Sequence, residues 1–249
     1  MNVFCDLHLH SCLSPCGDRD MTPNNLVRMA KLLGYDMIAL TDHNSCRNCA
    51  AAVKVGAREG VTVVPGMELC TAEEIHCICL FPSVEAAEAF SDEVRAALPP
   101  VQNRPDIFGE QLVLDDGDRV VDTEPLLLTT ASAVPLETVP ARAAQYGGAC
   151  FPAHLDRASY SVLSVLGMWY EELPFATVEF TPQAELSAYF LQHPLLRSKR
   201  IVRSSDAHYL ENMLERGNPL KLSAPTPDAV LRFVRGEAQK TDAGAFSKK

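Results

Sequence analysis

Short apolar runs alternate with amphipathic stretches along nearly the whole chain. The apolar runs predict strands over 2–8, 36–41, 61–65, 76–81, 149–153, 176–180 and 200–204. The stretches with helical periodicity predict helices over 24–33, 47–58, 84–97, 136–146, 159–167, 184–192 and 226–237. Strands that alternate with helices are typical of βαβ units, so the pattern indicates an α/β fold with a parallel sheet or barrel.

Residues 99–125 interrupt this alternation. The segment opens with closely spaced prolines, and two apolar runs then flank the turn Asp-Asp-Gly-Asp at 115–118. An Asp-Gly turn between apolar runs predicts a β-hairpin, which we expect to be a small insertion on the barrel and not a domain. We therefore expect one barrel domain over 1–240, followed by a flexible polar tail over 241–249.

Composition and charge narrow the class of protein. Hydrophobic residues make up 47% of the 249 residues and charged residues 22%, as in globular domains. No apolar run approaches the roughly 18 residues that span a bilayer, and the start does not resemble a secretion signal, so we expect a cytoplasmic protein without a membrane partner. The net charge of −10 argues against long nucleic acids as partners.

Residues able to bind metal ions lie next to the predicted strand ends. His8 and His10 are two apart on the first strand, so both project to one face and can bind one cation. Asp206 and His208 repeat this spacing after a later strand. Because catalytic groups of parallel barrels meet at the carboxyl ends of the strands, we expect these residues to converge. The candidates are His8, His10, His43, Glu68, His76, His154, Asp206 and His208.

The order of these residues resembles the PHP family, the polymerase and histidinol phosphatase domains. The resemblance rests on DLHLHS at 6–11, TDHN at 41–44, GMEL at 66–69, His76, PAH at 152–154 and SSDAH at 204–208. It implies a distorted seven-stranded barrel, (β/α)7, with two or three divalent ions at its mouth. Members of the family usually hydrolyse phosphate esters.

The resemblance also implies which residues hold each ion. One ion would be held by His8, His10, Glu68 and Asp206, a second by Glu68, His76 and His154, and a third by His43 and His208. Relatives with three ions supply a further His or Asp shortly after the His pair, where this chain has Pro15 and Cys16. We expect Asp18 to complete the third site, with the Cys16 thiolate as the alternative. Mixed nitrogen and oxygen ligands suit Zn, Mn or Fe and do not discriminate among them.

Phosphate binding and proton transfer need further groups. An Arg fork matches phosphate geometry, so we select Arg157 first and Arg47 second as substrate-binding residues. Glu68 and Asp206 are expected to act in catalysis through the ions. Glu179 is either an outer carboxylate or a general acid, and the sequence does not separate these roles.

Four cysteines follow the metal-binding motifs on predicted loops. Cys12 and Cys16 come after the His pair, and Cys46 and Cys49 come after His43. The two pairs together would make a four-thiolate site for zinc or an iron-sulfur cluster. The alternative, which we favour, is four reduced loop thiols, because neither spacing alone is diagnostic.

These features predict a metal-dependent phosphoesterase that hydrolyses a small phosphorylated metabolite or nucleotide through a metal-bound hydroxide. A non-catalytic metal-binding regulatory module and an exonuclease acting on short nucleic acid ends are the alternatives. An amidohydrolase-like barrel is less favoured, because many such barrels bridge their metals with a modified lysine and none lies between Lys54 and Lys199. The sequence leaves the oligomeric state open.

Overall fold

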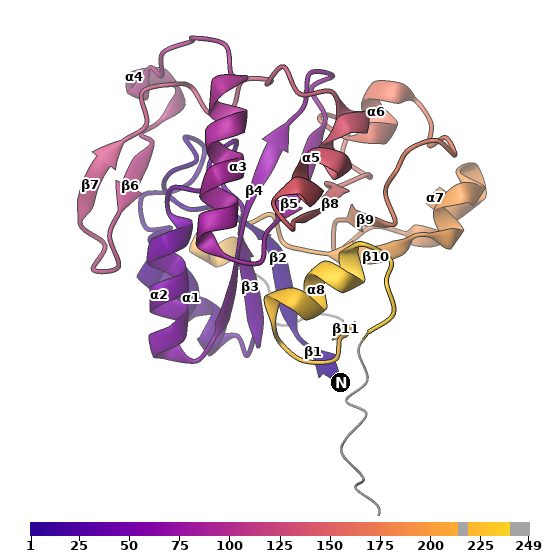
Figure 1. Ribbon diagram of the computed structural model, residues 1–249, viewed down its shortest axis with the longest axis horizontal. Helices are drawn as coiled ribbons and strands as arrows, with labels where there is room; N and C mark the ends of the chain where they lie inside the picture. Colours follow the sequence, from indigo (N-terminus) through magenta and orange to yellow (C-terminus); the bar gives the residue numbers. More distant parts are fainter. Residues whose placement is uncertain (214–218, 240–249) are drawn as a thin grey trace, which may run out of the picture.

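The computed structural model describes residues 1–213 and 219–239, and the predicted tail over 241–249 lies outside them. Its central sheet has five strands in the order β2-β3-β4-β5-β8 (Figure 1). Their bounds are β2 (Cys5–Leu9), β3 (Met37–Leu40), β4 (Thr62–Cys70), β5 (His76–Leu80) and β8 (Ala149–Pro152). The sheet curls like a half-barrel, so the chain has a mixed α/β fold.

Two further strands continue the curl. β9 (Thr177–Phe180) and β10 (Arg200–Arg203) pair in parallel as a separate two-stranded sheet. Main-chain contacts join this sheet to both ends of the five-stranded one. Leu9 forms a bridge with Ala207, and the Leu155 N–H donates to the Glu179 carbonyl oxygen at 2.9 Å. The seven-unit count of the (β/α)7 barrel stays a prediction, because strand pairing does not close the described sheets into one ladder.

The direction of β5 differs from the expected parallel sheet. β2, β3 and β4 run parallel, but β5 is antiparallel to both β4 and β8. β4 is also longer than the predicted strand at 61–65, and it returns into β5 through a short turn. His76 therefore pairs with Cys70, and the amino end of β5 lies at the same rim as the carboxyl end of β4.

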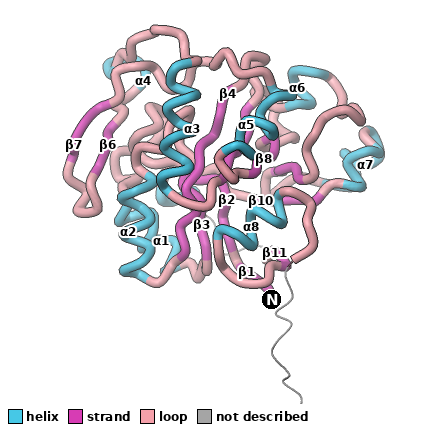
Figure 2. The backbone as a smooth tube through the Cα atoms, viewed as in Figure 1, coloured by secondary structure: helices cyan, strands magenta, loops and turns pink. Residues whose placement is uncertain are grey.

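The helices form close to their predicted positions (Figures 1 and 2). Their bounds are α1 (Pro23–Leu32), α2 (Cys49–Glu59), α3 (Val84–Ala96), α5 (Val139–Gln145), α6 (Val162–Leu166), α7 (Leu186–Gln192) and α8 (Pro227–Val234). α1 begins at Thr22, whose hydroxyl accepts the Asn25 N–H, and Pro23 suits the first turn. The predicted strand 2–8 is divided into β1 (Asn2–Val3) and β2, and the predicted helix 136–146 begins with the 3-10 turn η1 (Leu136–Thr138). Short elements that periodicity did not predict are α4 (Pro105–Phe108), the 3-10 turns η2 (Pro194–Ser198) and η3 (Leu210–Asn212), and the strand β11 (Leu220–Lys221).

Both faces of the central sheet are buried. Ile38 and Leu40 of β3 pack into the apolar layer that includes residues of α1, α2, α3 and α5. Met37 and Ala39 face the opposite layer, which includes residues of α8. Apolar residues at every position of β3 follow from this double burial. Over 1–213 and 219–239, the helices are too short or too polar to cross a bilayer.

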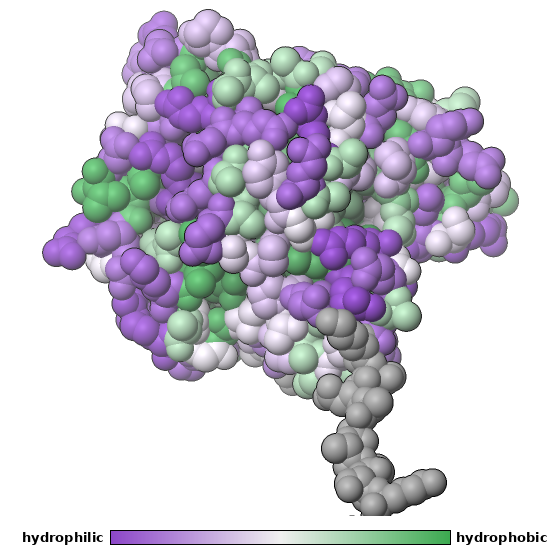
Figure 3. Space-filling view, viewed as in Figure 1, coloured by the Kyte–Doolittle hydropathy of each residue, from purple (hydrophilic) through white to green (hydrophobic). Residues whose placement is uncertain are grey.

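The segment around 112–123 forms an antiparallel hairpin, as its Asp-Gly turn predicts. β6 (Leu112–Leu114) pairs with β7 (Val120–Thr123), and Asp118 adopts a positive φ of 59° in the turn. Val120 and Val121 are exposed on β7, and Figure 3 shows hydrophobic side chains at this edge of the molecule. The division of the chain into one domain stays a prediction.

Candidate metal centre

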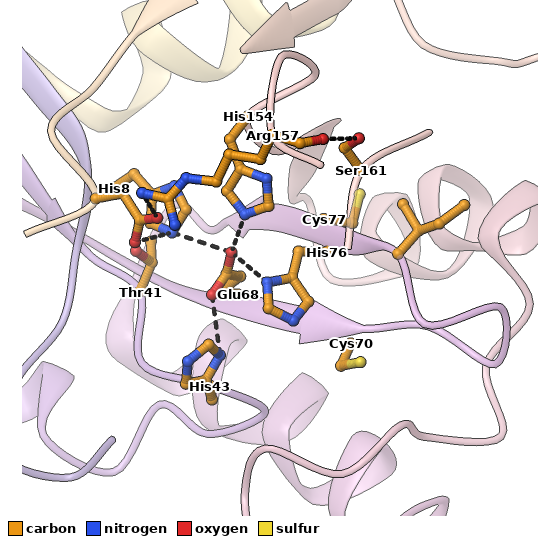
Figure 4. A network of polar contacts seen from close by, with 12 residues as sticks. His8, Thr41, His43, Glu68, Cys70, His76, Cys77, His154, Arg157 and Ser161 are labelled. Atoms are coloured by element: carbon orange, nitrogen blue, oxygen red, sulfur yellow. Dashed lines mark hydrogen bonds and ion pairs between the residues drawn. The ribbon is translucent and has the colours of Figure 1, made fainter. Parts of the chain in front are cut away.

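The structure brings the predicted ligands together at one rim of the curled sheet (Figure 4). Strands β2, β3, β4 and β8 deliver residues at or just beyond their carboxyl ends, whereas β5 delivers His76 from its amino end. Asp206 and His208 follow β10. These residues are buried apart from Asp206 and His208, which are half-buried. The convergence that strand ends predict is therefore present, with His76 arriving from the opposite direction.

Glu68 lies at the centre of this cluster, with only 1% of the residue exposed. Its two oxygens are 2.9–3.4 Å from nitrogens of His8, His10, His43, His76 and His154. Oε1 faces His8, His76 and His154, whereas Oε2 faces His10 and His43 (Figure 4). A carboxylate that presents different oxygens to different groups of histidines is positioned to bridge two cations.

The distances around the His pair fit a metal ion. His8 Nε2 and His10 Nε2 are 3.1 Å apart, and each lies 3.2 Å from Asp206 Oδ1. Ligand atoms around a tetrahedral zinc with bonds of about 2.0–2.1 Å lie roughly 3.3 Å apart. Asp206 Oδ1 is buried and makes no hydrogen bond, although both nitrogens are close to it. These atoms therefore have the spacing of ligands around a common cation.

The main chain is strained at two of the ligands. His154 has a φ of 28° and Asp206 a φ of 53°, in the left-handed region that non-glycine residues rarely adopt. Such conformations cost about 1–3 kcal/mol each and persist when the surroundings hold them. The His154 N–H donates to Glu179 Oε2 at 3.0 Å, and Arg157 N–H donates to the His154 carbonyl oxygen at 2.9 Å. These bonds fix the turn that carries His154.

Two hydrogen bonds orient the histidine pair. The His8 Nδ1 group bonds Glu179 Oε2 at 2.9 Å, and His10 Nδ1 bonds Ser14 Oγ at 2.9 Å. The Ser14 hydroxyl in turn donates to the buried Asp42 carboxylate at 2.7 Å. Both rings are thereby fixed with Nε2 toward the cluster. Of the two roles proposed for Glu179, this geometry favours an outer carboxylate over a general acid.

A small pocket of about 120 Å³ opens onto the cluster. Its lining includes His43, Glu68, His76, Arg157 and Tyr160. The Tyr160 ring stacks on His76 at a centroid distance of 4.6 Å, and the Tyr160 carbonyl oxygen accepts the His76 N–H at 2.8 Å. Neither Tyr160 nor Ser14 was identified from the sequence. The sequence contained one signal for Ser14, which is its position four residues after His10. It contained no signal for Tyr160.

The two candidate arginines lie in different places. Arg157 reaches the metal centre, where its guanidinium is 2.8 Å from Asp206 Oδ2. Arg47 does not reach the metal centre, so the structure gives no support to its prediction as a substrate-binding residue. Its guanidinium turns toward the hairpin, where it pairs with Asp122 and Glu124. A larger pocket of about 370 Å³ opens beside Arg47, but the metal-binding histidines do not line it.

Asp18 is also not a ligand in this structure. Its carboxylate accepts the N–H of Asp20 at 2.8 Å, because both residues belong to the same exposed turn. Cys16, the alternative, instead makes side-chain hydrogen bonds with His43 and His208. After the His pair, Cys16 is therefore the residue whose side chain contacts His43 and His208.

The four cysteines do not form a common site. The thiols of Cys46 and Cys49 both donate to the Gly66 carbonyl oxygen, at 3.1 and 3.4 Å, and lie in the apolar core. Cys12 is buried, and Cys16 is exposed. Among the described residues, the groups with metal-binding geometry contain only His and Glu. The structure therefore gives no support to the four-thiolate alternative.

The charges of the cluster shift the pKa values of its histidines. Burial lowers the pKa of His8, but the charges of Asp206, Glu179 and Glu68 together raise it well above its ordinary value. Burial and the charge of His208 hold the pKa of His10 well below its ordinary value. Burial opposes protonation of His43 as well, but Glu68 and Cys16 raise its pKa to about 10. Without metal, protons on His8 and His43 balance the buried carboxylates.

The raised pKa of His43 predicts how the stability of the metal-free protein depends on pH. The folded pKa of about 10 exceeds the ordinary value of 6.5, so protonated His43 stabilises the fold below pH 6.5. This contribution is lost as the pH rises from 6.5 through about 10. Thermal unfolding in the presence of a chelator should therefore show stability falling over this window. His43→Asn should flatten the profile there, and equal profiles for both proteins would contradict the assignment.

The chain matches the model of the PHP domain over residues 6–147. An uncharacterized protein of Methanocaldococcus jannaschii is 33% identical over 96 residues, which cover 35% of this chain and 56% of that protein. The match thus spans about half the length of this relative.

Solved structures share the fold at low sequence identity. The lesion-specific endonuclease PfuEndoQ of Pyrococcus furiosus superposes with a TM-score of 0.65 at 17% identity, over 95% of this chain and 56% of that chain. A protein of Bifidobacterium adolescentis described as a metal-dependent phosphoesterase gives 0.58 at 17% identity, over 94% of this chain and 96% of that one. An amidohydrolase of Chromobacterium violaceum gives 0.58 at 17%, over 90% and 93%. At such identities the likeness shows the fold alone.

Proposed function

The chain belongs to the PHP domain family, and from this premise we propose that it is a metal-dependent phosphoesterase acting on a small phosphorylated metabolite or nucleotide. The observation that carries the proposal is the position of Glu68, whose two oxygens lie 2.9–3.4 Å from nitrogens of five histidines. A carboxylate with a purely structural role needs only one histidine as its partner. A carboxylate buried among five imidazoles is instead suited to a centre with more than one cation.

The residues would hold two or three divalent ions, for which Zn, Mn and Fe are all suitable. We assign His8, His10, Glu68 and Asp206 to one ion, Glu68, His76 and His154 to a second, and His43 and His208 to a third. When bound, these ions would lower the pKa of water to give a nucleophile and neutralise the phosphoryl oxygens. Glu179 and Ser14 hold His8 and His10 in their ligand orientation.

The size and lining of the pocket support a phosphoryl group as the part of the substrate that enters. Its volume of about 120 Å³ suits a small group such as a tetrahedral anion. Arg157 lies at this pocket with 46% of its side chain exposed, so its fork can bind non-bridging oxygens. The remainder of the substrate would lie outside, beside Tyr160, which is 43% exposed.

Turnover of a generic aryl phosphate in the presence of Mn²⁺ tests this function. The wild-type protein should hydrolyse it, and Asp206→Asn should be much slower, because the amide cannot replace the carboxylate that touches His8 and His10. A screen of phosphorylated metabolites and short oligonucleotides would then identify the preferred substrate. Equal, negligible activity of both proteins on all of them would favour the metal-binding regulatory module.

Arg157→Ala is expected to reduce kcat/KM for a phosphate ester by about 10- to 100-fold. A hydrogen bond to a charged group contributes about 1.5–3 kcal/mol, and each 1.36 kcal/mol corresponds to about tenfold in rate. Arg157→Lys should recover only part of the loss, since lysine keeps the charge without the fork. Arg119→Ala, which alters an arginine with 83% of its side chain exposed on the hairpin, serves as the control. Steady-state kinetics that are unchanged in Arg157→Ala would exclude this role.

A further inference from the structure

Cys16 occupies a fixed position beside the metal centre. The Gly17 N–H donates to the Ser14 carbonyl oxygen at 2.8 Å, and the Asp18 N–H donates to the His208 carbonyl oxygen at 2.8 Å. A side chain at Gly17 would meet the Ser11 carbonyl oxygen at 2.4 Å, so the turn tolerates only glycine there. The turn thus connects the loop after β2 to the loop after β10, with Cys16 between them.

The Cys16 sulfur contacts two imidazole rings, each of which has a nitrogen that can still bind a metal ion. It hydrogen-bonds with His43 and His208. His208 Nδ1 already donates to the Asp206 carbonyl oxygen at 3.0 Å, which leaves Nε2 for another partner. His43 Nδ1 is buried and makes no hydrogen bond, although Glu68 Oε2 lies 2.9 Å away. Ligand nitrogens of His10, His43 and His208 lie within 4.8 Å of one another.

Of the nine cysteines, Cys16 alone is exposed. A buried thiol packs as a small apolar side chain, as Cys46 and Cys49 do in the core. An exposed thiol placed between two histidines has no packing role. Its side chain instead hydrogen-bonds with His43 and His208, and thiolate sulfur and imidazole nitrogen occur together as ligands of zinc.

We propose that Cys16, as a thiolate, binds the third cation together with His43 and His208, and that this site selects Zn²⁺ over Mn²⁺. The inference rests on the proposed metal centre and specifies the ligand and the metal of one site within it. Thiolates suit Zn²⁺, whereas Mn²⁺ favours carboxylates, carbonyls and water. Binding converts the S–H group into a sulfur–metal bond, and the proton leaves to solvent.

Loading the protein with Co²⁺ in place of the native metal tests the ligand directly. A thiolate bound to Co²⁺ gives an intense near-ultraviolet charge-transfer absorption that nitrogen and oxygen ligands do not give. Wild-type protein should show this absorption, and Cys16→Ser should lose it while keeping Co²⁺ at the sites around Glu68. Cys16→His should keep Co²⁺ at the third site without the absorption. Cys5→Ser, which alters a half-buried thiol at the start of β2, should match wild type.

Competition between the two metals tests the selectivity. With equal Zn²⁺ and Mn²⁺ and measurement of bound metal, wild type should retain one zinc equivalent that Cys16→Ser lacks. The zinc affinity of that site should fall by at least about 10-fold, since even outer partners of metal ligands contribute 10- to 100-fold.

The outcomes separate this inference from the proposed function. Wild-type protein without the charge-transfer absorption, or Cys16→Ser that keeps it, would overturn the thiolate ligand even if the protein hydrolyses phosphate esters. The absorption without any phosphoesterase activity would leave the thiolate site standing and overturn the proposed function. Equal zinc content in wild type and Cys16→Ser would overturn the selectivity.

Discussion

Glu68→Gln is expected to abolish cooperative metal binding and to reduce phosphoesterase activity by at least about 10³-fold. The bridging ions would contribute several kcal/mol of transition-state stabilisation, and about 4 kcal/mol corresponds to 10³-fold in rate. Glutamine has nearly the same shape but carries no charge and presents only one acceptor oxygen. It cannot replace the two charged oxygens that Glu68 presents to the histidines of both proposed ions.

Metal content and kinetics of the same preparation measure this effect. Glu74→Gln is a matched control, because the same change falls on an exposed residue of the turn after β4. Circular dichroism should show that both variants fold. Glu68→Gln that retains full metal and wild-type activity would show that Glu68 does not bridge cations, and the assignment of two ions around it would then fail.

Removal of the cations with a chelator is expected to lower the unfolding temperature by roughly 8–16 °C. A metal present at 1,000 times its dissociation constant stabilises the folded state by about 4 kcal/mol. For a chain of this size, each kcal/mol shifts the unfolding temperature by about 2–4 °C. The buried carboxylates Glu68 and Asp206 then depend for their neutralisation on protonated histidines and, for Asp206, on Arg157.

Thermal unfolding with and without chelator, followed by addition of Zn²⁺ or Mn²⁺, checks this prediction. Added metal should restore the wild-type temperature. Asp206→Asn should show a much smaller difference between its two states, because it binds fewer ions at the outset. An unfolding temperature that does not change after complete removal of metal would mean that the cluster is stable without cations.

Local patterns were sufficient for most of the fold. The periodicity of apolar residues located the strands and helices, because burial imposes a repeat of two or 3.6 residues on each element. The repeat carries no information about direction. The apolar run of β5 therefore resembles a parallel strand, and its reversal depends on the turn that joins β4 to His76. The pattern also did not predict that β4 extends beyond Pro65 to Cys70.

The candidate site was predictable where a ligand lies on a strand or beside its end. His8, His10 and Glu68 belong to this class, because the strand fixes the direction of the side chain. Arg47 and Asp18 lie on loops, where close sequence neighbours point in different directions. Arg47 turns away because Asp122 and Glu124, far along the chain, attract its guanidinium. Such partners cannot be identified without the fold.

The loops that carry the metal-binding residues depend on contacts with the hairpin inserted after α3. The Asn48 side chain joins Leu112 and Leu114 of β6 to Ser11, and Arg47 in the loop after His43 pairs with Asp122 of β7. The loops beside His10 and His43 are therefore braced by a segment that itself supplies no ligand. Transplanting the ligand residues onto another barrel would require the hairpin as well, and a shortened chain without it would lose the support of both loops.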